Sequence, residues 1–221
     1  MTGTHRTAAR IFIVDDHPVM RRGLSQIIED LDDMQTAGEA RGAAEAAKMI
    51  PTAEADLVLI DVSLGDGSGL ELIKDLKSRD PEMKMLVLSM HDESLFAERA
   101  IRAGALGYVN KNEPTETVIT AMRQVLTGRI FLSDRVTTQI VERTAASGDR
   151  SVPSPIETLS DRELEVFEMI GEGLITKQIA AKLHLSTKTI ETYRENIKTK
   201  LHLGNSVELM RHAVQWVLEG G

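Results

Sequence analysis

Short, uninterrupted apolar runs recur in the first part of the chain, and longer amphipathic stretches lie between them. Because the central runs do not alternate apolar with polar residues, both of their faces must be covered, as in a parallel sheet. The pattern therefore predicts five strand–helix units, which form a doubly wound α/β domain with a five-stranded parallel sheet over residues 1–128. The runs are Ile11–Val14, Leu57–Ile60, Met85–Leu88 and Leu106–Val109, with a weaker one near Thr36–Ala40.

The pattern changes after residue 128. Residues 129–158 read as a linker with a helical first part, because the stretch 143–158 contains two prolines, one glycine and few large apolar groups. Beyond this linker, apolar residues recur only at helical spacing. Ser160 and Glu163 form a capping box, which is typical of the start of a helix. We predict a small all-α domain of four helices over residues 159–221.

The composition excludes several classes of protein. No apolar run approaches the roughly 18 residues that a membrane-spanning helix needs, and the first ten residues show no signal-peptide pattern. We therefore expect a cytoplasmic protein. The absence of cysteine excludes disulfide scaffolds, thiolate metal sites and cysteine nucleophiles. A net charge of −8 argues against non-specific polyanion binding by the chain as a whole.

Polar side chains follow the predicted strands at their carboxyl ends. Asp15 and Asp16 follow the first run, Asp61 the third, Ser89 the fourth and Lys111 the fifth. Ligands of parallel α/β sheets bind at this edge. Converging carboxylates repel each other unless a cation neutralises them, and their hard oxygen ligands suit Mg²⁺. A carboxylate beside Mg²⁺ can accept a phosphoryl group, and we predict that Asp61 is this acceptor.

Each of these residues also has an ordinary structural interpretation. An aspartate at the end of a strand often caps a helix or forms a turn, and Ser89 or Lys111 alone would be a loop serine or a solvated lysine. Independent caps and loops have no reason to gather at one end of one sheet. The position of the five residues together therefore favours a site.

Two other motifs fail on spacing in the loop after Asp61. An EF-hand would need acidic or amide groups two and four residues later and a glutamate at the twelfth loop position, where Ser63, Gly65 and Leu72 stand. An aspartate-dependent phosphohydrolase would need a second aspartate in place of Ser63.

Four segments resemble, in order, the motif blocks of the receiver domain of two-component response regulators. They read IFIVDDHPVMRRGL, LVLIDVSLGDGSGLELI, MLVLSMHDE and GYVNKNEP. The resemblance implies a flavodoxin-like fold and phosphoryl transfer from a sensor histidine kinase to Asp61. It also implies that Mg²⁺ is held by Asp16, Asp61 and the backbone carbonyl of Ser63, with Asp15 helping through water.

The same resemblance implies roles for further residues. Ser89 and Lys111 would bind the phosphoryl group, and Tyr108 matches the aromatic switch that turns inward when the hydroxyl residue moves. Ser63 and His91 occupy positions that tune hydrolysis of the acyl phosphate in this family. The chain departs from the family at Gly65, where proline is usual, so the lifetime of the acyl phosphate stays open.

The sequence predicts a helix, a short turn and a second helix over Thr176–Leu183 and Thr187–Leu201. Thr176 and Ser186 are the predicted N-cap residues of the two helices. Apolar residues at helical spacing predict that the two helices share a buried seam. This seam consists of Ile179, Ala180, Leu183, Ile190, Ile197 and Leu201.

The helix pair is locally cationic, with six basic and two acidic side chains over residues 176–200. A rotation of 100° per residue turns Lys188, Thr192, Glu195 and Thr199 outward, where they can enter a DNA major groove. Charge alone favours the alternative of an ordinary solvated helix. The candidate DNA contacts are Thr176, Lys177, Thr187, Lys188, Thr189, Glu191, Thr192, Tyr193, Glu195, Lys198 and Lys200.

The segment LSDRELEVFEMIGEGLITKQIAAKLHLSTKTIETYRENIKTKLHL resembles the LuxR-type helix-turn-helix, from Leu159 to Leu203. A receiver followed by this module is the NarL/FixJ type of response regulator, which implies double-stranded DNA as a partner. The family often has Val-Lys-x-His where this chain has Ile-Glu-Thr-Tyr at residues 190–193. Glu191 can accept from a cytosine amino group but would repel phosphate.

Together these features predict a transcription factor that is controlled by phosphorylation and reads DNA as a homodimer. We expect no enzymatic activity beyond self-phosphotransfer and autodephosphorylation. Two alternatives stay open: a signalling or phosphate-sink module whose helical domain binds protein, and a regulator that is switched without phosphate. Apolar stripes that could dimerise lie on the later receiver helices, around 96–101 and 118–126, and on the last helix, with Val207, Met210, Val214 and Val217.

Overall fold

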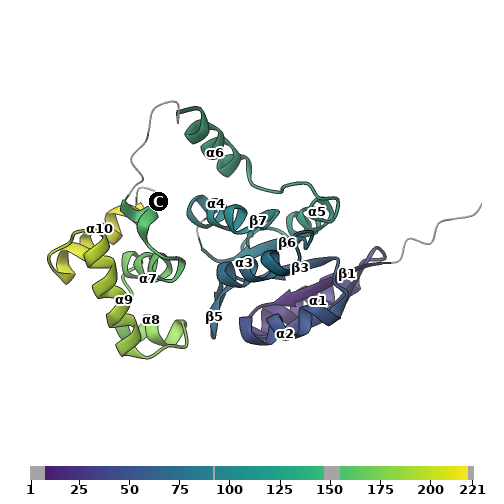
Figure 1. Ribbon diagram of the computed structural model, residues 1–221, viewed down its shortest axis with the longest axis horizontal. Coiled ribbons are helices and arrows are strands. Elements are labelled where there is room, and N and C mark those ends of the chain that lie inside the picture. Colours follow the sequence, from purple (N-terminus) through teal and green to yellow (C-terminus); the bar gives the residue numbers. More distant parts are fainter. Residues whose placement is uncertain (1–7, 92, 147–154, 219–221) are drawn as a thin grey trace, which may run out of the picture. The chain divides into compact units, whose positions relative to one another are not determined.

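The computed structural model describes residues 8–91, 93–146 and 155–218. The chain divides into two compact units, Met1–Thr137 and Thr138–Gly221 (Figure 1). The expectation about a signal peptide falls largely on residues 1–7, which lie outside the described residues. No helix among the described residues is both long enough and apolar enough to cross a membrane.

The first unit is built on a parallel sheet, as predicted. Its strand order is β2-β1-β3-β6-β7, which is the flavodoxin-like order, and every strand pair is parallel. A small antiparallel pair that the sequence did not predict follows β3. The strands are β1 (Ala9–Val14), β2 (Met34–Ala40), β3 (Leu57–Ile60), β4 (Ser63–Leu64), β5 (Gly67–Ser68), β6 (Met85–Ser89) and β7 (Gly107–Asn110).

Helices α1 to α5 lie around the sheet (Figure 1). Helices α1 and α5 pack on one face, because their apolar side chains form one cluster with Ile11, Ile13, Leu59 and Leu86. Helix α3 contacts both α2 and α4. Strands β3 and β6 are buried along their whole length, which is why their sequences do not alternate. The helices are α1 (Pro18–Glu29), α2 (Ala43–Ala53), α3 (Gly69–Arg79), α4 (Glu93–Ala103) and α5 (Thr115–Leu126).

The chain beyond α5 returns to the edge of the sheet before it leaves the first unit. Phe131 forms a parallel bridge with Gly107 of β7. Helix α6 (Asp134–Ala146) follows, so a helix occupies part of the predicted linker and ends within the stretch 143–158. Residues 147–154 of that stretch lie outside the described residues, and a short 3-10 helix, η1 (Pro155–Thr158), follows them.

The second unit is all helical among its described residues. It contains α7 (Asp161–Gly171), α8 (Thr176–Lys182), α9 (Thr187–Lys200) and α10 (Ser206–Leu218). Helix α7 packs against both α9 and α10. The six residues of the predicted apolar seam are all buried. The predicted capping box is confirmed, because Glu163 N donates to Ser160 Oγ at 3.3 Å and Ser160 N donates to Glu163 Oε2 at 2.8 Å.

One of the two N-caps predicted for the helix pair is wrong. Ser186 caps α9 as expected, since its Oγ accepts from Thr189 N at 3.0 Å. At α8, however, Ile175 is the N-cap and Thr176 is the first helical residue. The side chain of Gln178 accepts from Ile175 N at 3.0 Å, so this helix start is satisfied without a capping hydroxyl.

Candidate functional site

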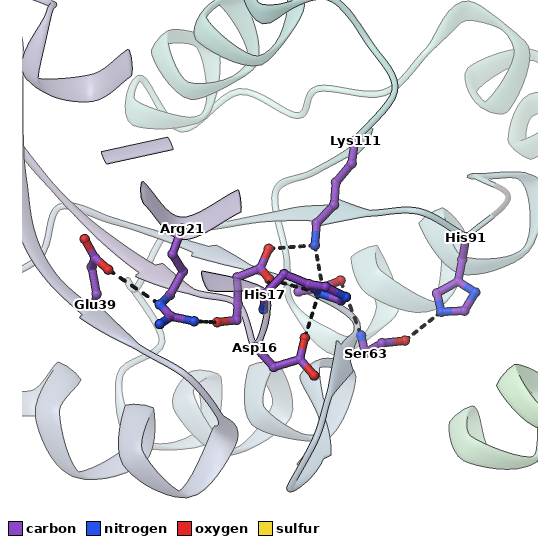
Figure 2. A network of polar contacts seen from close by, with 9 residues as sticks. Asp16, His17, Arg21, Glu39, Ser63, His91 and Lys111 are labelled. Carbon is purple, nitrogen blue, oxygen red and sulfur yellow. Dashed lines mark hydrogen bonds and ion pairs between the residues drawn. The ribbon is translucent and has the colours of Figure 1, made fainter. Parts of the chain in front are cut away.

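The carboxyl ends of β1 and β3 bring three aspartates together, as predicted. Asp15 and Asp61 each follow their strand directly and are buried, with 2% and 4% of their surface exposed. Asp16 is less buried. One carboxylate oxygen from each aspartate and one nitrogen of His17 all lie within 4.8 Å of one another. Residues from two distant parts of the chain thus form one acidic pocket (Figure 2).

Lys111 enters this pocket from the end of β7 (Figure 2). Its Nζ donates to Asp15 Oδ2 and to Asp61 Oδ2, each at 2.6 Å. The lysine side chain is only 3% exposed, so water screens these ion pairs little. Lys111 therefore ties two acidic side chains from neighbouring strands to each other.

Burial and the neighbouring charges act in opposite directions on the pKa values of Asp61 and Lys111. Burial raises the pKa of Asp61 to about 6, although the positive charge of Lys111 acts in the opposite direction. Burial by itself would lower the pKa of Lys111, but the carboxylates of Asp61 and Asp15 outweigh it and raise that pKa above its ordinary value. At neutral pH the pocket therefore contains a charged ammonium and an ionised Asp61.

The donor set of the pocket fits a divalent cation. Oxygens bound to one octahedral Mg²⁺ lie about 3 to 4 Å apart, and the ligand atoms of the pocket all lie within 4.8 Å of one another, close enough for a small closure around one ion. Three carboxylates and one ammonium leave two negative charges, which one divalent ion would balance. Asp16 and Asp61 would hold the ion, and Asp15 lies beside them.

The hydroxyl residue at the end of β6 lies where the sequence predicted it. Ser89 is fully buried, and its Oγ accepts from His91 N at 3.2 Å. The ring of His91 is turned toward the loop after Asp61, where its Nε2 lies 2.7 Å from Ser63 Oγ (Figure 2). Ser63 N lies 3.4 Å from Asp61 Oδ1. The two positions that the resemblance links to hydrolysis are thus in direct contact with each other.

Tyr108 points inward although the hydroxyl of Ser89 still bonds to the amide of His91. Its side chain is 1% exposed, and its hydroxyl donates to the carbonyl of His91 at 3.0 Å. Asn110 Nδ2 donates to the same carbonyl at 3.1 Å. The turn that carries His91 is therefore held by two side chains of β7 and by the hydroxyl of Ser89.

Sequence reasoning missed two residues of the pocket. His17 Nδ1 lies 2.8 Å from Asp16 Oδ1, and its position directly after two aspartates was the available signal. A Cβ on Gly69 would lie 2.0 Å from the carbonyl oxygen of Asp61, so only glycine fits against the backbone of Asp61. The glycines of the loop LGDGSG were visible in the sequence, but this close approach was not.

The predicted outward face of α9 is confirmed as exposed in the second unit. Lys188, Thr192, Glu195 and Thr199 are all exposed. Lys177 and Thr187 are exposed as well, whereas Thr189 and Tyr193 are half-buried. The rotation of 100° per residue therefore predicted correctly which side of this helix is open to a ligand.

Other candidate DNA contacts are engaged within the second unit. Lys200 Nζ donates to the buried carboxylate of Glu163 at 2.6 Å and lies 3.3 Å from the carbonyl of Thr158. Although burial acts in the opposite direction, the bonds of Glu163 to Lys200 and Ser160 lower its pKa below the ordinary value.

Two further contacts join candidate DNA-binding residues to each other. Thr176 Oγ1 donates to Glu191 Oε1 at 2.7 Å, which connects α8 to α9. Lys198 Nζ lies 2.8 Å from Glu195 Oε1. The structure thus gives Thr176 and Glu191 a role in holding the two helices together.

Comparison with known families gives two matches. The family described as response regulator receiver domain matches residues 11–123, and the family described as bacterial regulatory proteins, luxR family, matches residues 157–213. Oxygen regulatory protein NreC of Staphylococcus haemolyticus is 35% identical over 210 residues, which cover 93% of this chain and 97% of NreC.

Solved structures show the same architecture. A two-component response regulator of the LuxR family from Aurantimonas sp. SI85-9A1 is 32% identical with a TM-score of 0.59, covering 63% of this chain and 99% of that chain. RcsB from Salmonella enterica serovar Typhimurium, bound to promoter rprA in the presence of phosphomimetic BeF3−, is 24% identical with a TM-score of 0.60. This match covers 94% of our chain and 99% of the RcsB chain, and it is a likeness of fold alone.

Proposed function

This chain belongs to the two-component response regulators that carry a receiver domain and a LuxR-type DNA-binding domain, and we propose that phosphorylation of Asp61 by a sensor histidine kinase controls its binding to DNA. The observation that carries the proposal is the contact of Lys111 with both Asp15 and Asp61 at 2.6 Å. A charged lysine beside a buried carboxylate, at the carboxyl end of a parallel sheet, suits the binding of a phosphoryl group.

Asp61 acts in this proposal as the nucleophile. An oxygen of its carboxylate attacks the phosphorus of a phosphohistidine, the bond from phosphorus to the histidine nitrogen breaks, and an acyl phosphate forms. Lys111 binds the oxygens of the transferred phosphoryl group, and the hydroxyl of Ser89 donates to it. Mg²⁺, when bound by Asp16, Asp61 and the Ser63 carbonyl, would offset the negative charge of the group.

Phosphorylation then shifts an equilibrium between two arrangements of the loop after β6. Ser89 turns its hydroxyl toward the phosphoryl group, and Tyr108, which already points inward before this movement, keeps its inward position. Ser63 and His91, which contact each other beside the acceptor, control the access of water to the acyl phosphate. We propose no chemistry for this chain beyond phosphotransfer to itself and autodephosphorylation.

We further propose that the second domain reads DNA with α9 in the major groove. The exposed face with Lys188, Thr192 and Glu195 supports this assignment. Two copies of the chain would read two half-sites, and dimerisation would multiply the affinity. Val207 and Met210 of α10 are exposed, whereas the apolar stripes of α4 and α5 lie mainly in the receiver core, so α10 is the better-supported surface.

This function corresponds to a division into a receiver (1–128), a linker (129–158) and a DNA-binding domain (159–221). We propose that the protein acts in the cytoplasm, where it meets both the kinase and the DNA. The match to the luxR family argues against the alternative in which the helical domain binds protein instead.

Genome-wide capture of DNA by the wild-type chain and by Asp61→Ala tests the proposal. We expect the wild type to enrich defined sites and Asp61→Ala to enrich them poorly. Binding should weaken steeply as salt rises, in proportion to the phosphates contacted. Equal enrichment by both proteins would refute control through Asp61, and enrichment by neither would refute the assignment of DNA as the ligand.

A further inference from the structure

The chain that leaves the receiver sheet is held at two points before α6 begins. The first point is β7, because Phe131 N donates to Leu106 O at 2.9 Å and Tyr108 N donates to Phe131 O at 3.1 Å. The second point is α4, because Ser133 Oγ donates to Glu93 Oε1 at 2.7 Å. Residues 131–133, which we call the exit segment, therefore bridge the edge strand and the start of a helix.

Ser133 has a second role in the exit segment. Its Oγ accepts from Val136 N at 3.3 Å, and its carbonyl accepts from Thr137 N at 3.0 Å. These are the bonds that an N-cap residue makes with the first turn of a helix. Val136 in that turn is 2% exposed. The residue that touches Glu93 thus also organises the start of α6.

Glu93 lies close in sequence to the residues that contact Ser89 and Tyr108. It is the first residue of α4 and follows His91 by two positions. The carbonyl of His91 accepts from Tyr108, and its amide donates to Ser89 Oγ. When the hydroxyl of Ser89 turns to a phosphoryl group, the amide of His91 loses this partner. His91, two residues before Glu93, is then held by its carbonyl alone, through Tyr108 and Asn110.

We propose that the hydrogen bond between Ser133 and Glu93 is the contact through which the receiver site regulates α6. The proposal rests on the proposed function, because phosphorylation of Asp61 has to move Ser89. The backbone bonds of Phe131 hold one end of the exit segment on the sheet. A shift of Glu93 therefore breaks the Ser133 bond and loosens the first turn of α6, along which the chain leaves the first unit.

The size of the effect follows from the chemistry of the bond. A hydrogen bond to a carboxylate is stronger than one between neutral groups, and its loss changes an equilibrium by about tenfold. Only the amides of α6 that depend on the Ser133 cap should respond. Helices that end far from the exit segment, such as α2, should keep their exchange rates.

Hydrogen exchange of the full-length chain, with and without beryllium fluoride and Mg²⁺, tests the proposal. In the wild type we expect the first amides of α6 to exchange about tenfold faster when the phosphoryl mimic is bound. In Glu93→Ala they should exchange fast from the start and gain nothing further. Glu71→Ala is the matched control, because Glu71 lies in the first turn of α3 and forms an exposed pair with Lys74.

Two substitutions distinguish the hydrogen bond between Ser133 and Glu93 from the N-cap role of Ser133. Ser133→Asp keeps a good N-cap residue but places a second carboxylate against Glu93, so α6 should no longer respond. The double variant Ser133→Asp, Glu93→Gln restores a donor for that carboxylate, and the response of α6 should return. A response that stays absent in the double variant contradicts the proposal.

Exchange around Asp61 distinguishes the possible failures. If the wild type shows no protection of residues 57–70 by beryllium fluoride, the proposed function fails and this inference fails with it. If those residues are protected in the wild type and in Glu93→Ala, but α6 responds equally in both proteins, only the inference is wrong. The inference is also wrong if the first amides of α6 exchange as fast in Glu71→Ala as they do in Glu93→Ala.

Discussion

Lys111 Nζ lies 2.6 Å from Oδ2 of Asp61, although 50 residues separate the two in the chain. The same nitrogen lies 2.6 Å from Oδ2 of Asp15. One ammonium thus balances two buried carboxylates that would otherwise repel each other. Asp61, the proposed phosphoacceptor, is therefore held in place by the charge of Lys111 as well as by its position at the end of β3.

Lys111→Met should destabilise the receiver. The variant leaves Asp15 and Asp61 buried without their cation, and breaking a buried ion pair costs about 3 kcal/mol. Urea unfolding of the metal-free protein near neutral pH measures the loss. Adding Asp61→Asn should recover part of it, because one of the two unpaired charges is then removed. An unchanged unfolding midpoint in Lys111→Met would contradict the shared ion pair.

The unfolding free energy should depend on pH through Asp61. Its pKa is about 6 in the folded chain and about 3.9 in the unfolded chain. Between these values the folded state binds more protons, so this contribution is lost as pH rises from about 4 to about 6.

Asp61→Asn isolates this contribution. Two pH units correspond to about 3 kcal/mol, so the variant should gain about that much stability over the wild type between pH 4 and 7 in the absence of metal. Mg²⁺ should reduce the difference, because it stabilises the ionised carboxylate. Urea unfolding at several pH values with EDTA and with Mg²⁺ measures both effects. A difference that does not vary with pH would show that Asp61 has an ordinary pKa.

Gly69→Ala should damage the acceptor site. A Cβ at this position would lie 2.0 Å from the carbonyl oxygen of Asp61, so the backbone of one segment has to move. We expect a loss of about 2 to 3 kcal/mol in unfolding free energy and weaker binding of beryllium fluoride. Gly23→Ala in α1 is the control, because its Cβ meets nothing within 4 Å. Normal beryllium fluoride binding by Gly69→Ala would refute this reading.

Lys200 and Lys177 should behave differently although both were predicted to contact DNA. Lys200→Met removes the partner of the buried Glu163 and should lower the stability of the second domain by about 1 kcal/mol. Lys177→Ala should leave stability unchanged.

DNA binding is the second measurement of this comparison. The wild-type chain first selects a duplex from a random library, and the affinity of each variant for that duplex is then measured. If Lys177 contacts a phosphate, the slope of log affinity against log salt should fall by about 1 in Lys177→Ala. Thermal unfolding measured beside the salt titration separates the two roles. If both variants are equally stable, Lys200 does not stabilise the second domain through Glu163, and its predicted role as a DNA contact stands.

Much of the fold could be predicted because its signals are local. Solid apolar runs indicate strands covered on both faces, and all five predicted runs are strands. The capping box at Ser160 and the N-cap at Ser186 depend only on neighbouring residues, and both were predicted correctly. The N-cap predicted at Thr176 was wrong, since a side chain inside the helix, that of Gln178, satisfies the free amide instead.

The candidate site was predictable only where it follows from the fold class. Asp15, Asp61 and Lys111 gather because parallel strands present their carboxyl ends at one edge, which follows from the fold class alone. The contact of Ser63 with His91 was not predictable, because it depends on how two loops pack. The contact of Lys200 with Glu163 was missed for a similar reason, since 37 residues separate the two side chains.

The amino-acid sequence by itself determined which apolar runs are buried, where the five strands of the sheet and most helices lie, and which side chains stand at the ends of the strands. These properties depend on periodicity and on neighbours a few residues away. Only the tertiary structure decided which polar groups become partners, as with Ser133 and Glu93 or the close approach of Gly69 to Asp61. Such contacts form between segments that the folded sheet brings together, so their distances depend on the packing of the whole domain.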